Sequence, residues 1–181
     1  PESRYNEVMG FLDNNDLDDL CISRPKTRVS WGIELPNDKD YVVYVWFDAL
    51  INYITGVGCF TDDKRFEKWW PADIHFIGKD ILRHHGVFWP IMLKALGLQL
   101  PKTILAHGWW QFQGEKMSKS RGNIVNPFEL VSELKEALGG DERAAVDAVR
   151  YFLLREIPVG IDGNFSWEAI IGRITAELSN D

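Results

Sequence analysis

The sequence predicts an α/β fold over residues 1–108, followed by a mainly helical remainder. The first part of this prediction rests on short apolar runs at residues 73–77 and 103–106, which are separated by a helical stretch at residues 79–96. Strand, helix and strand in alternation are typical of a parallel sheet covered by helices. The second part rests on the sequence after Gly122, where helix start and stop signals replace the β-branched runs.

The composition is that of a folded globular protein. A length of 181 residues corresponds to about one domain at roughly 150 residues per domain. The hydrophobic fraction of 45% and the charged fraction of 26% exclude disordered, collagen-like and low-complexity classes. The net charge of −7 argues against a protein that coats nucleic acid, but it leaves room for a local basic site.

The two cysteines, Cys21 and Cys59, are too few for a disulfide framework or a four-cysteine zinc site, and we expect both to be buried thiols. No apolar run approaches the roughly 18 residues that cross a bilayer, so we expect no membrane partner. The N-terminus has neither a signal-peptide core nor an initiator methionine. We therefore expect a cytoplasmic protein, of which this chain is a piece.

Four elements are expected before the first alternating unit. Residues 6–12 have helical spacing and end in the acidic turn of residues 13–16. Residues 27–31 and 41–46 are rich in β-branched and aromatic side chains, which favours strands. The second of these runs shows little polar alternation, as expected for a strand covered on both faces. Residues 47–54 then return to helical spacing.

The clearest unit is the alternating one. Residues 73–77 form an apolar strand, Gly78 is the turn, and residues 79–96 are expected to form one long helix, with a kink or an early break at Pro90. Residues 103–106 form the next strand. The apolar stripe expected along the helix consists of Ile81, His85, Phe88, Met92 and Leu96.

Helices dominate the remainder. An N-cap asparagine followed by proline starts a helix over residues 126–138, which the glycine pair 139–140 stops. A second helix starts at Asp141 and closes before Pro158. Residues 162–164 carry a turn signal, and Ser166 caps a last helix that is still amphipathic at Asp181.

The sharpest chemical feature is the loop of residues 114–122, GEKMSKSRG, which we call the lysine loop. It places Lys116, Lys119 and Arg121 within six residues of an acidic chain, between glycines that allow mobility. Compact lysine charges with interleaved serine hydroxyls suit a polyphosphate ligand. The alternative is a solvated surface loop with ordinary lysines, which is the usual role of a charge run.

The string Lys-Met-Ser-Lys-Ser resembles the nucleotide-binding signature of class I aminoacyl-tRNA synthetases. Further stretches narrow the resemblance to the methionyl-tRNA synthetase family and cover nearly the whole chain in the family's order. They are Cys21-Ile22-Ser23-Arg24, Trp31-Gly32-Ile33, and residues 41–53, 75–85, 104–108, 116–127 and 148–158. Other class I synthetases would share only the lysine-loop string.

The resemblance implies a division into three parts. Residues 1–108 would be the second half of a Rossmann-type parallel sheet, residues 109–163 the lysine loop with a stem-contact segment, and residues 164–181 the first helix of an anticodon-binding helical domain. The family's His-Ile-Gly-His signature and its metal-binding insertion are absent from the sequence. The resemblance therefore implies an internal fragment that is inactive alone, with the N-terminal half supplied in cis or by a separate chain.

The implied activity is that of a methionine–tRNA ligase, with L-methionine, ATP and tRNA(Met) as partners and Mg²⁺ on the phosphates. No residue is identifiable as a ligand of Mg²⁺. We expect Lys116 and Lys119 to have the catalytic role of neutralising the leaving phosphates, and the resemblance favours Lys119 for direct contact with ATP. The ATP-binding positions implied are Gly78, Asp80, His107, Gly108, Lys116, Met117, Ser118, Lys119 and Ser120. From the residues alone, Asp80 is better explained as an acid in a first helical turn, and His107 is almost as well explained as a structural histidine.

The resemblance assigns the methionine side chain to five positions. They are Trp46, Ala49, Tyr53, Ile81 and His85. The first three have helical spacing and share one face, as do the last two, so they could form an apolar slot with polar tips that suits a thioether. Without the resemblance, such a stripe is more simply core packing.

Two other functions remain open. One is a non-catalytic fragment that binds a nucleotide or tRNA, which methionine-dependent ATP–pyrophosphate exchange would distinguish. The other is a class I synthetase for another aliphatic amino acid, which competition between methionine and leucine or valine would distinguish.

Overall fold

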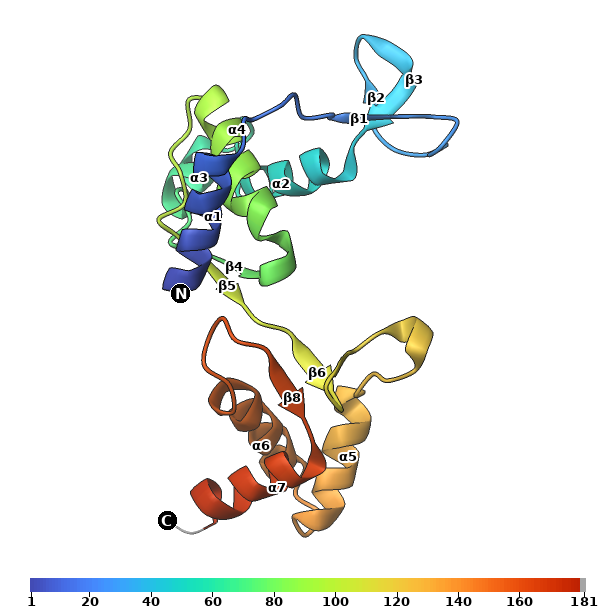
Figure 1. Cartoon of the computed structure of the whole chain (residues 1–181), viewed down its shortest axis with the longest axis vertical. Helices are drawn as coiled ribbons and strands as arrows, with labels where there is room; N and C mark the ends of the chain where they lie inside the picture. Colours follow the sequence, from blue (N-terminus) through green and yellow to red (C-terminus); the bar gives the residue numbers. More distant parts are fainter. Residues whose placement is uncertain (180–181) are drawn as a thin grey trace. The chain divides into compact units, whose positions relative to one another are not determined.

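The structure is a computed structural model that describes residues 1–179, and it consists of two compact units (Figure 1). The N-terminal unit is Pro1–Leu105 and the C-terminal unit is Ala106–Asp181. Both contain helices and strands, so the predicted α/β class is confirmed. No helix within residues 1–179 is long and apolar enough to cross a membrane.

A small antiparallel sheet of order β1-β3-β2 lies in the N-terminal unit, with β1 at Ser23–Pro25, β2 at Glu34–Leu35 and β3 at Asp38–Val43. The strand expected at residues 27–31 is wrong. The chain turns there instead, because the backbone N–H groups of residues 28 and 29 both donate to the Pro25 carbonyl.

Coverage of β3 also differs from the expectation. In β3 only Val42 is buried, and Tyr41 remains 38% exposed. The strand ends at Val43, and the helix expected from residue 47 already begins at Val45. Lack of alternation therefore did not indicate burial on both faces in this segment.

Three helices accompany this sheet: α1 (Glu2–Asn14), α2 (Val45–Thr55) and α3 (Asp63–Trp69). The helices expected at residues 6–12 and 47–54 are confirmed and are longer than predicted. The core of the unit consists of Leu50, Ile54, Cys59, Trp70, Trp89 and Leu93. The prediction for cysteine is therefore right for Cys59 but wrong for Cys21, which is exposed in the irregular segment before β1.

The long helix expected at residues 79–96 is wrong as a single regular element. It consists of η1 (Lys79–Ile81), the π-helical η2 (His84–Phe88) and α4 (Trp89–Ala95). Pro90 lacks a backbone N–H and its ring crowds the preceding turn, which explains why the π-helical turn lies just before it. The chain remains helical through Pro90 to Ala95, so the irregularity precedes the proline and the helix does not break at Pro90 itself.

The buried face of this segment also differs from the predicted stripe. Of the five predicted residues only His85 is fully buried, and Leu96 is 45% exposed. The face that packs inward carries Leu82, His85, Trp89 and Leu93. The segment connects β4 (Ile74–Gly78) to its hydrogen-bonded neighbour β5 (Thr103–His107), and both strands lie close to their predicted positions.

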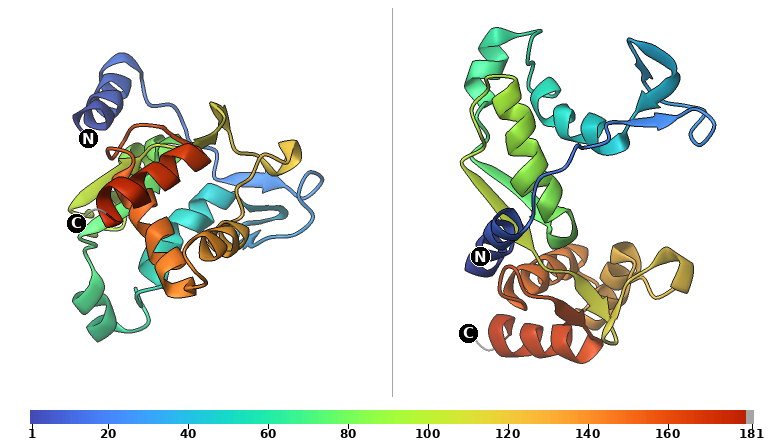
Figure 2. Two further views of the ribbon diagram at one scale, coloured as in Figure 1. Left: turned by 90° about the horizontal axis from the view of Figure 1, so that it is seen from below. Right: turned by 45° about the horizontal axis from the view of Figure 1, so that its top comes forward.

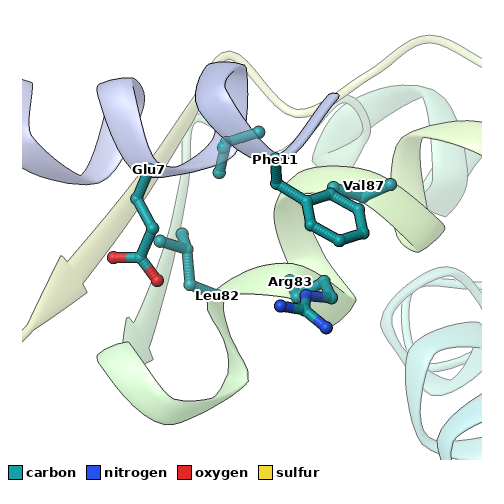
Figure 3. Close-up of a pocket in the computed structure, with 6 residues that line it drawn as sticks. Glu7, Phe11, Leu82, Arg83 and Val87 are labelled. Carbon is teal, nitrogen blue, oxygen red and sulfur yellow. The ribbon is translucent and has the colours of Figure 1, made fainter. Parts of the chain in front are cut away.

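Helix α1 packs against this segment through a small apolar contact (Figure 3). Phe11 of α1 points toward Val87, and the Arg83 guanidinium lies 4.2 Å from the centroid of the Phe11 ring. The cavity left between them measures about 60 Å³. Pockets for drug-sized ligands are several times larger, so this contact anchors α1 and forms no binding site.

The C-terminal unit has a three-stranded sheet of order β7-β6-β8, with β6 at Trp110–Phe112, β7 at Glu115–Lys116 and β8 at Gly163–Phe165. Figure 2 shows β6 (yellow) beside β8 (dark red). β6 pairs antiparallel with β7 and parallel with β8. The turn expected at residues 162–164 is therefore wrong beyond Asp162. Gly163 is required by space in the strand, because a Cβ there would lie 1.8 Å from the Ile157 side chain.

The predicted helices of this unit are confirmed as α5 (Pro127–Ala137), α6 (Glu142–Arg155) and α7 (Trp167–Arg173), which η4 (Ile174–Leu178) continues. Their predicted caps form: the side chains of Asn126, Asp141 and Ser166 each accept a backbone N–H of the first turn. Residues 180–181, to which the last helix was expected to extend, lie outside the described residues. The buried core consists of Leu130, Leu134, Ala145, Ala148, Val149, Phe152, Phe165, Ile170 and Ile174.

Candidate functional site

A chain of hydrogen bonds connects α2 to the helical segment after β4. The Tyr53 hydroxyl lies 2.9 Å from His85 Nε2, and His85 Nδ1 lies 2.9 Å from the Ile81 carbonyl oxygen. Because a carbonyl only accepts, Nδ1 bears the proton, and Nε2 of the neutral ring accepts from the tyrosine hydroxyl. Three of the five predicted methionine positions are therefore joined in one bonded arrangement.

Trp46 closes one side of this arrangement. Its ring lies edge-on to His85, with centroids 6.4 Å apart. Helix α2 places Trp46, Ala49 and Tyr53 on one face, as their spacing predicts, and Ala49 is exposed between the two rings. The structure thus places the predicted residues of α2 on one aromatic surface, with the small side chain of Ala49 exposed on it.

Further residues of this aromatic surface escaped the sequence analysis. His75 and Trp89 lie behind Tyr53: Trp89 Nε1–H donates to His75 Nε2 over 3.1 Å, and the Tyr53 and His75 rings are 4.3 Å apart. His84 stacks on Trp46 with a centroid distance of 4.1 Å. The signal for His75 was its alternation with Ile77 in β4, where only those two side chains are fully buried. We call Trp46, Tyr53, His75, His84, His85 and Trp89 together the histidine–aromatic cluster.

Burial keeps the histidines of this cluster neutral. Loss of solvation lowers the pKa of His75 to about 4, with a further contribution from His85. It also lowers the pKa of His85, against the opposing effect of the Ile81 carbonyl, and lowers that of His84. Burial raises the pKa of Tyr53. At neutral pH the cluster is thus an uncharged environment with its polar atoms mostly paired internally.

A cavity of about 310 Å³ adjoins the cluster on the side of Trp46 and His84. Its wall includes Phe88 and Met92 as well as those two rings. His84 Nδ1 is buried there and has no hydrogen-bond partner among the described residues. The cluster is therefore bordered by space of ligand size.

Gly78 and Asp80 stand where the sequence analysis placed them, at the end of β4 and in the turn that follows. The Asp80 carboxylate folds back over the glycine, since a Cβ on Gly78 would lie 2.6 Å from Asp80 Oδ1. The absence of a side chain at residue 78 thus allows an exposed acid to lie close to the backbone at the strand end.

His107 is the last residue of β5 and Gly108 follows it, and both belong to the C-terminal unit. His107 Nδ1–H donates to the Gly108 carbonyl over 2.7 Å. Gly108 is tightly packed, because a Cβ there would lie 1.9 Å from the Ile161 carbonyl oxygen. Only glycine fits at this position, whatever ligand the neighbouring histidine contacts.

The lysine loop is tied to the C-terminal unit at both ends. At its start the Gly114 N–H donates to Asn164 Oδ1 over 2.7 Å. Near its end Asn123 accepts from the Ser118 N–H over 2.8 Å and donates to the Lys116 carbonyl over 3.2 Å. The predicted hinge glycines, at residues 114 and 122, both have a positive φ, of 77° and 68°.

Within the loop the cations differ in their surroundings. The Lys116 ammonium lies 3.9 Å from the centroid of the Trp109 ring. Lys119 is exposed in the 3-10 turn η3 (Lys119–Arg121), and Arg121 pairs with exposed Glu115 over 3.0 Å. Met117 packs against the core of the unit, and Ser118 Oγ lies 2.9 Å from Ser120 Oγ. The ammonium group of Lys116 therefore lies on an aromatic ring, and that of Lys119 belongs to an exposed turn.

No group of three or more acidic, histidine or cysteine side chains that could hold a metal ion occurs within residues 1–179. We assign no residue of this chain to Mg²⁺.

Comparisons with family models and with known proteins identify the same family. The family of "tRNA synthetases class I (M)" matches residues 1–181. The methionine–tRNA ligase of Caldanaerobacter subterraneus subsp. tengcongensis is 52% identical over the whole chain, which covers 26% of that relative's length. The corresponding ligase of Mycobacterium tuberculosis H37Rv is 53% identical, and the chain covers 33% of it.

A solved structure is similar as well. It is Mycobacterium tuberculosis methionyl-tRNA synthetase in complex with methionyl-adenylate, with a TM-score of 0.85 and 52% identity over 99% of this chain and 33% of that one. The chain thus spans about a quarter to a third of the length of these relatives. The family match extends over every residue, and the two relatives are 52% and 53% identical to this chain over its whole length. The chain therefore belongs to the class I tRNA synthetases of the M group.

Proposed function

We propose that the protein containing this chain is a methionine–tRNA ligase, which uses ATP to convert L-methionine to methionyl-adenylate and transfers the methionyl group to tRNA(Met). The named relatives support the activity. The observation that carries the proposal is the bonded arrangement of Tyr53, His85 and the Ile81 carbonyl within the histidine–aromatic cluster. It is an uncharged, aromatic site of the kind that accepts a thioether side chain.

Both nitrogens of His85 are already engaged, one by Tyr53 and one by Ile81. The methionine sulfur would therefore meet ring edges, chiefly of Trp46 and Tyr53, in the sulfur–aromatic contacts that a polarizable thioether favours. Ala49 leaves room between these rings because it has only a methyl group. The sequence predicted a slot with polar tips for the thioether, and in the structure both nitrogens of the His85 tip are bonded within the cluster.

Activation of methionine needs no nucleophile from the enzyme. An oxygen of the methionine carboxylate attacks the α-phosphorus of ATP, a new P–O bond forms, and the bond to the departing pyrophosphate breaks. Catalysis then consists of positioning the reactants and neutralising the charge on the leaving group. We assign the neutralising role to Lys116 and Lys119, with Met117, Ser118 and Ser120 completing the loop around the phosphates.

The other nucleotide contacts in the proposal are Gly78 and Asp80 for the ribose and His107 and Gly108 for the adenine. Mg²⁺ would accompany ATP through its phosphates, and we derive no step from it. The three-part division at residues 108 and 163 and a cytoplasmic location belong to the same proposal.

The decisive test of the methionine site is His85→Ala in the full-length protein. We expect the KM for methionine to rise while the KM for ATP stays the same, because the variant removes the centre of the cluster and leaves the lysine loop intact. Phe128→Ala is a suitable control, since that aromatic side chain is 84% exposed on α5. An unchanged KM for methionine in His85→Ala would contradict the assignment.

A second test concerns turnover. We expect ATP–pyrophosphate exchange by the full-length protein to depend on methionine and not on leucine or valine. The 181-residue chain alone should show no exchange, because it lacks the His-Ile-Gly-His signature. Exchange stimulated by leucine or valine would favour another class I synthetase, and activity of the chain alone would show that the signature is dispensable.

A further inference from the structure

The two lysines of the lysine loop are held in different ways. Lys116 lies in β7 opposite Gln111 of β6, and its ammonium lies over the Trp109 ring at 3.9 Å from the centroid. Lys119 lies in the exposed turn η3. A cation over an indole face is attracted by the negative charge of that face. Lys116 therefore has a defined resting place on the protein.

The register of the β6–β7 hairpin explains this contact. Gln111 is directly opposite Lys116, and Trp109 precedes Gln111 by two residues, on the same side of the extended chain. Diagonal neighbours across an antiparallel pair lie within reach of long and aromatic side chains. The pairing of β6 with β7 thus selects which ring the lysine meets.

The indole is attached to a firmly held backbone. The Trp109 N–H donates to Asp162 Oδ1 over 2.9 Å, and the Trp109 carbonyl accepts from the Gly163 N–H over 2.9 Å. The preceding residue, Gly108, lies so close to Ile161 that no side chain fits. The ring therefore projects from the residue just before β6, whose backbone N–H and carbonyl are both hydrogen-bonded.

The backbone of Lys116 is held as well. Its carbonyl accepts from the Asn123 side chain, and the next residue, Met117, packs against the core of the unit. Glu115, the nearest acid in sequence, already pairs with Arg121. The ammonium can thus change partner by rotation of the flexible lysine stem, without movement of the loop backbone.

We propose that Trp109 is a positioning residue that holds the Lys116 ammonium on its ring while no nucleotide is bound, and that the polyphosphate of ATP draws the ammonium off. This inference rests on the proposed function. The exchange is favourable because charge-assisted hydrogen bonds to phosphate are stronger than an exposed cation–π contact. The ring thus gives the exposed lysine one defined position until its ligand arrives.

Nuclear magnetic resonance of the full-length protein tests the resting contact directly. After reductive ¹³C-methylation, the Lys116 methyl resonance, assigned by its loss in Lys116→Arg, should lie upfield of the other lysines because of the ring current of Trp109. Trp109→Leu should remove the upfield shift, and the control Trp110→Phe should keep it, since Trp110 packs on Phe152 at 5.4 Å instead. An unshifted Lys116 resonance in the wild type would overturn the proposal.

Titration with a non-hydrolysable ATP analogue and with inorganic tripolyphosphate tests the displacement. Either ligand should move the Lys116 resonance to the position found in Trp109→Leu. A resonance that stays upfield at saturation, with binding followed by calorimetry, would overturn the displacement by phosphate. If calorimetry shows no binding of ATP at all, the proposed function fails and displacement fails with it, while the upfield resonance still reports the resting contact.

Steady-state kinetics supply a readout that a merely structural role would not move. Trp109→Leu should lower the KM for ATP by about two- to fivefold, the value of an exposed cation–π contact, and leave kcat and the KM for methionine unchanged. Trp109→Phe, which keeps a ring and is the safer variant for folding, should give a smaller decrease. An increased KM for ATP in both variants would overturn the resting role of the ring.

Discussion

The histidine–aromatic cluster and the lysine loop use opposite electrostatic arrangements. In the cluster, burial lowers the pKa values of His75, His84 and His85. Most polar atoms of the cluster form hydrogen bonds with one another or with the Ile81 carbonyl. In the loop, the side chains of Lys116 and Lys119 are exposed. A site for an apolar side chain is formed by excluding water, whereas a site for polyphosphate keeps its cations solvated or on a polarizable surface until the ligand neutralises them.

The two regions also differ in how they are held together. The cluster lies in packed contact with the core of the N-terminal unit, where Trp89 is completely buried. The loop is held mainly by backbone hydrogen bonds to Asn123 and Asn164, with Met117 as its apolar anchor. Substitutions in the cluster should therefore affect folding and binding together, and substitutions in the loop should affect catalysis alone.

The largest effect is expected from Trp89→Ala. Removing a fully buried indole should lower the free energy of unfolding by about 3–5 kcal/mol, because a cavity forms and His75 loses its hydrogen-bond donor. Urea unfolding measures this change. The control is Trp31→Ala, whose side chain is 80% exposed and whose loss should cost less than about 0.5 kcal/mol. Equal effects of the two substitutions would show that the cluster is not a packed core.

Lys119→Ala should separate the loop from the cluster. We expect methionine activation in the full-length protein to slow by about 10²–10³-fold, equivalent to about 2.7–4 kcal/mol of barrier, with stability and methionine affinity unchanged. Pyrophosphate exchange measures the rate. Lys135→Ala is the matched control, because that lysine lies in the last turn of α5 and pairs with exposed Glu142 of α6. Equal loss of methionine affinity in Lys119→Ala would refute the phosphate role.

The pH dependence of stability should reflect the cluster and not the loop. His75 has a pKa of about 4 in the folded state, below the value of roughly 6.5 expected in the unfolded chain. As the pH falls, the unfolded state therefore binds the proton before the folded state does. The free energy of unfolding should decrease as the pH drops from about 6.5 through about 4, and above about 6.5 this histidine should not make it depend on pH. His84 and His85 have the same direction of shift and add to the slope.

His75→Gln tests this origin, since glutamine can still accept from Trp89. Urea midpoints measured from about pH 7 down to about pH 5 should fall less steeply in this variant than in the wild type. An identical slope would show that the pH dependence arises elsewhere.

The smallest expected effect is that of Tyr53→Phe. It removes the hydroxyl that donates to His85 and leaves the ring in place, so a net hydrogen bond of about 0.5–1.5 kcal/mol is lost. The KM for methionine should rise by about two- to tenfold, less than in His85→Ala. Tyr5→Phe, at a side chain that is 65% exposed on α1, serves as the control. A larger effect than that of His85→Ala would shift the centre of the site to the tyrosine.

The sequence by itself determined the features that depend on neighbouring residues. The caps at Asn126, Asp141 and Ser166 formed as predicted because each side chain bonds to a backbone N–H within three residues. The face shared by Trp46, Ala49 and Tyr53 followed from helical spacing alone. The motif of the lysine loop, and the family resemblance that it indicated, are likewise contiguous in the chain.

Only the tertiary structure decided what depends on distant partners. Residues 27–31 turn instead of forming a strand, and Gly163 lies in β8, because the available strand partners are fixed elsewhere in the chain. His75 and Trp89 join the cluster across 14 residues, and the β6–β7 register brings Trp109 to Lys116. Local patterns indicate which face of an element is apolar, but packing between elements determines which side chains that face contacts. In this protein those contacts form the candidate sites.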